Sequence, residues 1–251
     1  MAVPTIVWTA LVVLATVPYQ KENPTALVAT AREVIGGEAR LSTVRSLVLT
    51  GHTQNLIGST GKLSEPRPVD IRILLPDRYL RVQTESFYEL RSGFAGDRLL
   101  NSARALKPGD QFGATYGPEQ IGIERATFVR LMLGMLAQTT TVLPLTTHPA
   151  GNNSVRFAGP DGFAAMLELD AAGLPNRLRF QSRVHFPQPG STMPPPPVDA
   201  EVVWTFGERR EVNGLKLPHR ILRTSRDVTL EDLRFDTIRV NPPLSAKDFD
   251  K

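Results

Sequence analysis

The sequence contains no cysteine, and only six of its 29 basic residues are lysine. Without cysteine the chain can form no disulfide, no thiolate metal site and no lipid-modified N-terminal cysteine. The 29 basic and 25 acidic residues are spread along the chain without a block of one sign, so the charge pattern does not indicate nucleic-acid binding. A hydrophobic fraction of 41% and a charged fraction of 22% exclude a disordered chain and a polytopic membrane protein.

Long apolar runs are also scarce, and the clearest one lies in the first twenty residues. Residues 1–20 carry no charge, and Ile6–Val17 is almost wholly apolar but too short to cross a bilayer, which needs ~20 residues. This pattern is typical of a signal peptide, although no Lys or Arg precedes it and no clean cleavage motif follows. We therefore expect a signal peptide over residues 1–20 and a single periplasmic or secreted bacterial domain over residues 21–251, with no membrane span in the mature chain. A wrongly assigned start and an N-terminal strand are the alternatives.

Two helices are predicted. Asn23-Pro24 is an N-cap followed by proline at the first helical position, and Gly36-Gly37 ends the apolar repeat that follows. The second helix opens at Pro118-Glu119, and its segment Phe128–Ala137 is apolar on nearly every side, with Arg130 as the only charge. A helix of this kind is buried rather than laid on a surface. It is either a plain core helix or a plug whose methionines give way to a flexible apolar ligand.

Most of the remaining chain has strand patterns separated by turn residues. Helices lie outside the strand runs and there is no βαβ rhythm, which predicts an α+β fold with an antiparallel sheet of about ten strands that curls or closes. The predicted strands are Val44–Thr53, Val69–Leu75, Tyr79–Phe87, Glu89–Ala95, Arg98–Ser102, Asn153–Ala158, Phe163–Asp170, Asn176–Phe186, the two arms of a hairpin over residues 201–223, and Leu230–Asn241.

Asn213-Gly214 is the strongest turn signal in the chain, because both residues tolerate a positive φ. A two-residue turn places Trp204 and Phe206 on the face that a helix must cover, and it fixes four cross-strand pairs: Val212 with Leu215, Glu208 with His219, Phe206 with Ile221 and Trp204 with Arg223. A bulge at Pro218 would shift the register by one and invert this face. In the last strand the apolar parity changes between Phe235 and Ile238, so a bulge is expected near Asp236-Thr237.

No arrangement of residues points to catalysis or to a metal. The four histidines are scattered without ligand spacing, and the acidic residues sit at turns or on opposite faces of strands. Gly58–Lys62 has the wrong glycine spacing for a phosphate loop. Pro187–Pro197, with six prolines in eleven residues, is predicted to be a stiff hairpin loop. We therefore predict a non-enzymatic protein with no catalytic residue, no metal and no cofactor.

Four stretches together resemble the periplasmic outer-membrane lipoprotein-sorting protein family, which has the LolA/LolB-like fold. They are Gly36-Gly37-Glu38 leading to Val44–Leu47, the turn Leu169–Pro175, the hairpin Arg210–Pro218, and Val240–Leu244. The resemblance covers nearly all of the chain after the signal peptide, although each motif is mostly turn chemistry. It implies an incomplete antiparallel barrel whose concave face is covered by helices and holds acyl chains, with Phe128–Ala137 as the plug. It identifies no partner-binding residue, so the protein partner is unknown.

The leading hypothesis is an exported protein that binds a lipid, a lipoprotein acyl chain or another apolar ligand between sheet and helices. The rival is an interaction or sensor domain on the same fold, with a filled interior and a protein partner. The residues predicted to line the ligand site are Phe128, Leu131, Met132, Met135, Leu136, Phe180, Trp204 and Phe206.

Overall fold

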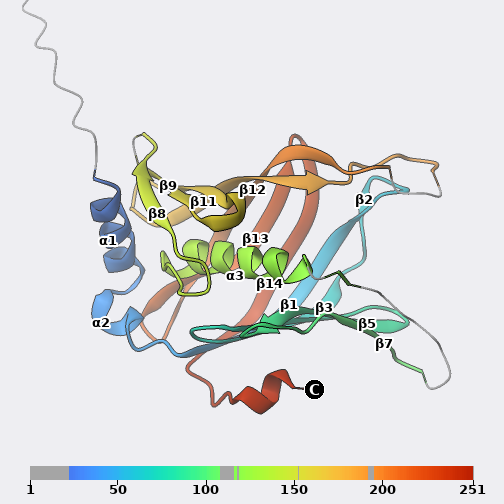
Figure 1. Ribbon diagram of the computed structural model, residues 1–251, viewed down its shortest axis with the longest axis horizontal. Coiled ribbons are helices and arrows are strands. Elements are labelled where there is room, and N and C mark those ends of the chain that lie inside the picture. Colours follow the sequence, from blue (N-terminus) through green and yellow to red (C-terminus); the bar gives the residue numbers. More distant parts are fainter. Residues whose placement is uncertain (1–22, 108–115, 118, 152, 192–194, 251) are drawn as a thin grey trace, which may run out of the picture.

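The computed structural model describes residues 23–107, 116–117, 119–151, 153–191 and 195–250, so the predicted signal peptide lies outside the described residues. Within these ranges one sheet of fourteen strands curves around a long helix, and two shorter helices cover one end of the curve (Figure 1). The helices are α1 (Pro24–Ile35), α2 (Glu38–Leu41) and α3 (Gln120–Leu136), with 3-10 turns η1 (Pro160–Gly162) and η2 (Ala246–Phe249). The strands are β1 (Ser46–Ile57), β2 (Lys62–Leu63), β3 (Arg67–Leu74), β4 (Arg78–Thr84), β5 (Tyr88–Ala95), β6 (Arg98–Leu99), β7 (Ser102–Ala105), β8 (Thr146–Pro149), β9 (Ser154–Ala158), β10 (Ala164–Leu169), β11 (Pro175–Val184), β12 (Val198–Val212), β13 (Leu215–Ser225) and β14 (Val228–Val240).

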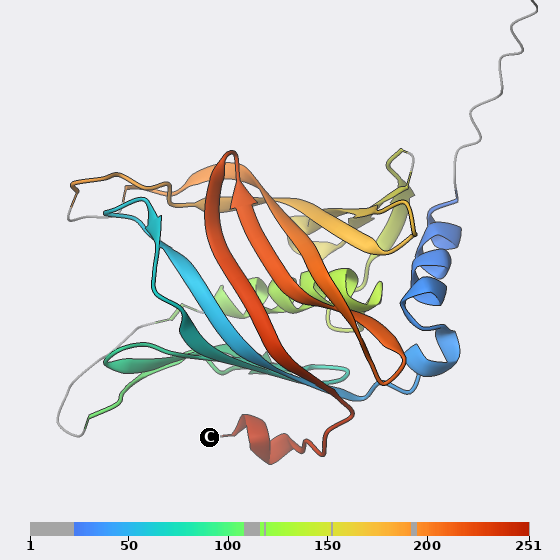
Figure 2. The same cartoon turned by 180° about the vertical axis from the view of Figure 1, so that it is seen from behind.

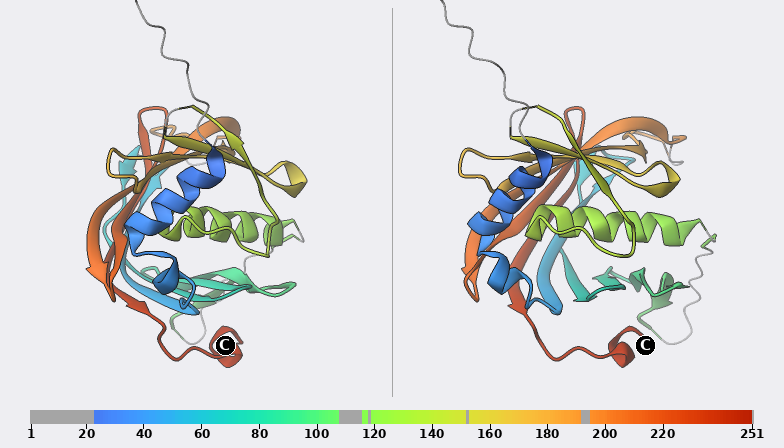
Figure 3. Two further views of the ribbon diagram at one scale, coloured as in Figure 1. Left: turned by 90° about the vertical axis from the view of Figure 1, so that its left-hand side faces the viewer. Right: turned by 60° about the vertical axis from the view of Figure 1, so that its left-hand side comes forward.

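The sheet is an incomplete antiparallel barrel, as predicted. Its order is β6-β5-β4-β3-β1-β14-β13-β12-β11-β10-β9-β8, with β2 paired to β1 and β7 paired to β5. The first long strand, β1, pairs with the last, β14, while β6 and β8 stand at opposite ends of the order. Seen end-on, the sheet wraps around α3 and leaves one side open (Figure 3). The prediction of about ten strands was low because β2 and β8 have only two and four residues, too few to show an alternating pattern. In addition, the predicted strand Arg98–Ser102 is divided into β6 and the start of β7.

The hairpin between β12 and β13 has the predicted register. Val212 pairs with Leu215, Phe206 with Ile221 and Trp204 with Arg223. Both turn residues have positive φ, 51° at Asn213 and 77° at Gly214. Pro218 does not shift the pairing. The predicted Glu208–His219 pair is absent from the ladder, because Glu208 turns to a φ of 51°, and the same register resumes at Arg209–Pro218.

A bulge in β14 lies where the parity of apolar residues changes. Thr237 pairs with Thr50 and Phe235 pairs with Gly51, so Asp236 is the extra residue. Phe235 and Ile238 are consequently both buried, at 2% and 5% exposure. Gly51 is required here, because a Cβ at this position would lie 1.9 Å from the carbonyl oxygen of Arg234. A bulge of this kind bends its strand and increases the local twist. Figure 2 shows the curved sheet from its convex side.

The helices close one end of the curve and fill its inside. The Asn23 side chain accepts a hydrogen bond from the backbone N–H of Thr25 and so caps α1, as predicted. Arg32 of α1 donates to the carbonyl oxygen of Leu136 at 3.4 Å, which links α1 to the last turn of α3. We call this side of the molecule, where α1, α2 and the Asn213-Gly214 turn lie, the helix end (Figure 1). The opposite side, where β1 ends and β12 begins, is the loop end.

The proline-rich loop between β11 and β12 packs at the loop end. Backbone N–H groups of Gln188 and Gly190 donate to the carbonyl oxygens of Gly58 and Ser59 at 2.9 and 3.1 Å. The Gly58–Lys62 stretch is therefore the turn that leads β1 into β2 and supports the loop. Residues 192–194 of the predicted loop lie outside the described residues.

Candidate functional site

The inside of the curve is an apolar layer between α3 and the concave face of the sheet. All eight side chains predicted to line a ligand site lie in this layer, and none is more than 9% exposed. Five of them come from α3, and Phe180, Trp204 and Phe206 come from β11 and β12. The position of α3, the alternation of side chains along β11 and β12, and the register of the hairpin thus bring the eight residues into one region. Whether they contact a ligand stays a proposal.

The aromatic side chains form two groups on either side of α3. Phe180, Trp204 and Phe206 form a row along β11 and β12, with ring centres 5.8 and 6.4 Å apart. Phe128 instead packs on the other half of the sheet, with its ring centre 6.1 Å from Tyr79 and 5.6 Å from Phe94. The sequence prediction omitted Tyr79 and Phe94. The strand alternation that starts at Tyr79 was the available signal, but it did not reveal which face meets the helix.

Gly134 lets α3 approach the aromatic row closely. A Cβ at this position would lie 1.8 Å from Cζ of Phe206. The Phe206 ring therefore rests against the backbone of the helix, in space that only glycine leaves free. Phe206 is 3% exposed and fixes both the height and the rotation of the helix over the sheet.

Polar contacts hold α3 only near its two ends. Arg125 donates to the carbonyl oxygen of Gly96 at 2.9 Å and to Asp97 at 2.5 Å, and Asn101 donates to Glu124 at 3.0 Å. At the other end, Arg32 reaches the last carbonyl of the helix. Between residues 126 and 135 the described residues provide no side-chain hydrogen bond or ion pair from α3 to the sheet. The middle of the helix is held by apolar packing and ring contacts.

A buried ion pair crosses the concave face toward the loop end. Arg81 of β4 donates to Glu231 of β14 at 2.5 Å, and the Thr53 hydroxyl donates to the same carboxylate at 2.9 Å. Arg81 also donates to the side-chain oxygen of Gln83 at 2.9 Å. Burial alone would raise the pKa of Glu231, but the charge and hydrogen bond of Arg81 lower it below its ordinary value. The carboxylate is thus charged, and both hydrogen bonds fall on its Oε1 oxygen.

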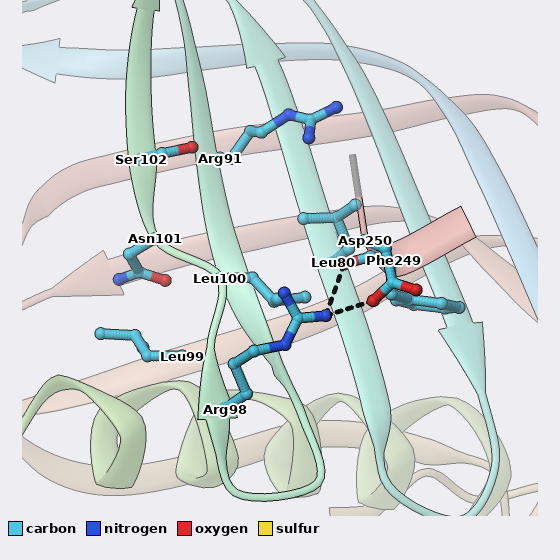
Figure 4. A pocket seen from close by; sticks show the side chains of 9 residues that line it. All are labelled: Leu80, Arg91, Arg98, Leu99, Leu100, Asn101, Ser102, Phe249 and Asp250. Carbon is cyan, nitrogen blue, oxygen red and sulfur yellow. Dashed lines mark hydrogen bonds and ion pairs between the residues drawn. The ribbon is translucent and has the colours of Figure 1, made fainter. Parts of the chain in front are cut away.

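Two surface pockets lie outside this interior. One, of about 210 Å³, is a cleft between β5, β6 and the C-terminal turn η2, where Arg98 donates to Asp250 and to the carbonyl oxygen of Phe249 (Figure 4). The other, of about 340 Å³, lies between α1 and the β12–β13 hairpin. The first belongs to the docking of the C-terminal turn, because Arg98 is already occupied there and Phe249 is buried against Leu80.

The described residues give no direct sign of catalytic or metal chemistry. Among them, no group of three His, Asp or Glu side chains is placed to hold a metal ion. His52 pairs with Asp236 at 3.0 Å on the surface, and burial lowers the pKa of His219, which contacts the carbonyl oxygen of Leu217. None of the helices in this part of the chain has the length and apolar character that a membrane span needs.

Comparisons with known proteins give a likeness of fold. No protein-family model matches the sequence, and no curated protein matches it either. The structure is similar to that of a LolA superfamily protein from Nitrosomonas europaea, with a TM-score of 0.51 and 9% identity over 92% of this chain and 98% of that one. A domain assigned as an outer membrane lipoprotein-sorting protein, from Vibrio parahaemolyticus, gives a TM-score of 0.48 and 12% identity over 91% of this chain and 97% of that one. The likeness to the Nitrosomonas europaea protein confirms the fold implied by the sequence motifs.

Proposed function

We propose that this chain, which has a LolA-like fold, is an exported periplasmic protein that carries an apolar ligand between α3 and the concave face of its sheet. The ligand is a lipid or the acyl chain of a lipoprotein, and the protein performs no catalysis. The ligand contacts are the eight residues of the apolar layer, from Phe128 on α3 to Phe206 on β12.

The observation that carries this proposal is the way in which α3 is held. Its middle contacts the sheet through apolar side chains, and Met132 and Met135 are two of them, both fully buried. Apolar contacts have no direction, so an acyl chain can replace them at little cost, and methionine adapts its shape easily. If buried hydrogen bonds fixed the helix along its whole length, an acyl chain could not replace its contacts with the sheet without leaving polar groups unpaired.

Exposed apolar residues at the loop end give the ligand a route to this layer. In the described residues, the exposed large apolar side chains are Ile57, Phe87, Leu106, Ile123 and Val198. They lie where β1 ends, between β4 and β5, after β7, in the first turn of α3 and where β12 begins, and these points all lie at the loop end (Figure 1). Scattered exposed apolar residues are ordinary, but their concentration at one end marks a surface that meets apolar material.

Tryptophan fluorescence tests the proposal directly. Of the two tryptophans, Trp8 lies in the predicted signal peptide, so the mature chain over residues 21–251 has Trp204, inside the apolar layer, as its emitter. Dibromostearate, whose bromine atoms quench a nearby indole, is expected to quench Trp204 in a saturable way. Native mass spectrometry of protein purified from a membrane-containing lysate is expected to show a bound lipid.

A matched pair of variants separates ligand contact from stability. Met132→Ala alters the apolar layer, whereas Leu80→Ala removes an equally buried side chain on the convex side. Both lower stability by about 2–5 kcal/mol, the range for such truncations in cores. Only Met132→Ala is expected to change the affinity for dibromostearate. Absence of saturable quenching, together with ligand-free protein in mass spectrometry, would refute the proposal and favour an interaction domain with a filled interior.

A further inference from the structure

Two arginines enter the concave interior without a carboxylate partner. The Arg130 guanidinium of α3 lies over the Phe180 ring, 3.9 Å from its centre, and 5.3 Å from the centre of the Phe163 ring. Arg223 of β13 stands opposite Trp204 on β12 and opposite Glu231 on β14. Among the described residues, neither arginine has a carboxylate oxygen within 4.0 Å.

Three buried N–H groups in this region lack an acceptor. They are Nε of Arg130, Nε of Arg223 and Nε1 of Trp204, none of which has a hydrogen-bond partner among the described residues. Trp204 is only 9% exposed, and its ring centre is 5.8 Å from that of Phe180, on which Arg130 is stacked. Phe180 thus connects Arg130 with Trp204, and strand pairing connects Trp204 with Arg223. Buried donors are almost always satisfied in folded proteins, so three neighbouring unsatisfied donors indicate an acceptor from outside the chain.

The charges in this region are also unbalanced. Glu231 accepts its two hydrogen bonds, from Arg81 and Thr53, on the single oxygen Oε1, and Glu124 accepts from Asn101. These two carboxylates face three arginines, Arg81, Arg130 and Arg223, so one positive charge is left without a counter-charge among them. Burial, followed by the charge of Arg223, lowers the pKa of Arg130 to about 10, so Arg130 is still charged at neutral pH. The two guanidinium groups, both on half-buried side chains, therefore repel each other, and an anion between them would relieve this repulsion.

We propose that the ligand is an anionic amphiphile whose carboxylate or phosphate binds between Arg130 and Arg223, with Trp204 as a third donor. This inference rests on the proposed function, since the tail of the same molecule occupies the apolar layer. Carboxylate and phosphate oxygens accept several N–H bonds at once, and guanidinium groups match their geometry. The headgroup site lies near the β13–β14 turn, toward the loop end, so the tail runs toward the helix end.

Two probes with the same tail test the headgroup. Dibromostearate and its methyl ester share one brominated tail and differ at the carboxyl group, which is charged in the acid and neutral in the ester. Both are expected to quench Trp204 in the mature chain. The acid is expected to bind at least about tenfold more tightly than the ester, as charge-assisted hydrogen bonds require. Arg223→Gln and Arg130→Gln are expected to remove this preference while leaving the affinity for the ester unchanged. Arg183→Gln, on the exposed face of β11, is expected to keep it.

The possible results separate this inference from the proposed function. Equal affinity of the unaltered chain for acid and ester would overturn the anion site, with water serving the three donors, while the carrier function stands. Equal loss of both affinities in Arg223→Gln and in Arg130→Gln would assign the arginines a structural role and would also overturn it. Failure of both probes to bind would refute the carrier function itself. Competition with dodecanoate and dodecyl phosphate then identifies the headgroup, and displacement by neither contradicts the inference.

Discussion

The contact between Gly134 and Phe206 predicts that two glycine-to-alanine substitutions in the same helix have opposite effects. In Gly134→Ala the added Cβ would lie 1.8 Å from Cζ of Phe206. Gly122→Ala places the same methyl group where nothing lies within 4 Å. Both substitutions gain up to about 1 kcal/mol of helix propensity, because glycine loses more backbone freedom on folding than alanine.

The size of the difference follows from packing. Carbon atoms that do not share a bond stay about 3.5 Å apart, so the Phe206 ring must move by more than ~1 Å in Gly134→Ala. Phe206 lies between the helix and Trp204, and overpacking of this kind costs about 1–3 kcal/mol, with the upper end expected for a fully buried ring. After the propensity gain, Gly134→Ala is destabilised by about 1–2 kcal/mol, whereas Gly122→Ala is stabilised.

Urea denaturation followed by circular dichroism measures both changes. A cycle with Phe206→Leu isolates the contact, because leucine lacks the distal ring atoms that the new Cβ would meet. We expect Gly134→Ala to cost less in the Phe206→Leu background, with a coupling energy of about 1–2 kcal/mol. If Gly134→Ala stabilised the protein as Gly122→Ala does, or if the two mutations were additive, α3 would not rest on Phe206, and the description of the apolar layer would be wrong.

Two further predictions concern the buried ion pair and the hairpin turn. Glu231→Gln leaves Arg81 buried without its counter-charge and is expected to cost about 3–5 kcal/mol in urea denaturation at pH 7. Because folding lowers the pKa of Glu231 from 4.5, its contribution to the free energy of unfolding is present above pH 4.5 and is lost as the pH falls through the folded-state pKa. The difference in unfolding free energy between Glu231→Gln and the unaltered chain should therefore narrow in acid. A difference that stays constant with pH would contradict the pairing. Gly214→Ala forces a side chain into a φ of 77°, and thermal denaturation is expected to show a loss of about 1–2 kcal/mol, whereas Asn213→Gly changes little.

The features that the sequence predicts well are those set by a few adjacent residues. Asn213-Gly214 determines its own turn and with it the register of two strands. The bulge at Asp236 follows from the change of parity between Phe235 and Ile238. Both features depend on backbone chemistry that acts over fewer than about six residues, so no knowledge of the fold is needed to find them.

The contacts that the sequence analysis missed join residues that are distant along the chain. Arg81 and Glu231 are 150 positions apart and meet only because β1 pairs with β14 and the sheet curves. Nothing in either local sequence distinguishes this pair from surface charges. Arg130 was noticed as the only charge on an apolar segment, yet its position over Phe180 depends on the rotation of α3, which Gly134 and Phe206 set. Side-chain partners across a curved sheet therefore require the structure.

The proposed carrier function makes two demands on the interior, one for the empty protein and one for the loaded protein. When the protein is empty, the site must exclude water, and α3 achieves this by placing Met132 and Met135 against the sheet. When the protein is loaded, the same contacts must be replaceable, which non-directional apolar packing permits and a continuous polar network would prevent. Arg130 and Arg223 are exceptions in this apolar layer, because partly burying a charge without a partner destabilises the empty protein. A fold that only needed a filled interior would gain stability from an apolar residue at position 130 or 223. Under the proposed function, an anionic ligand accounts for both arginines in the concave face, which folding alone does not require.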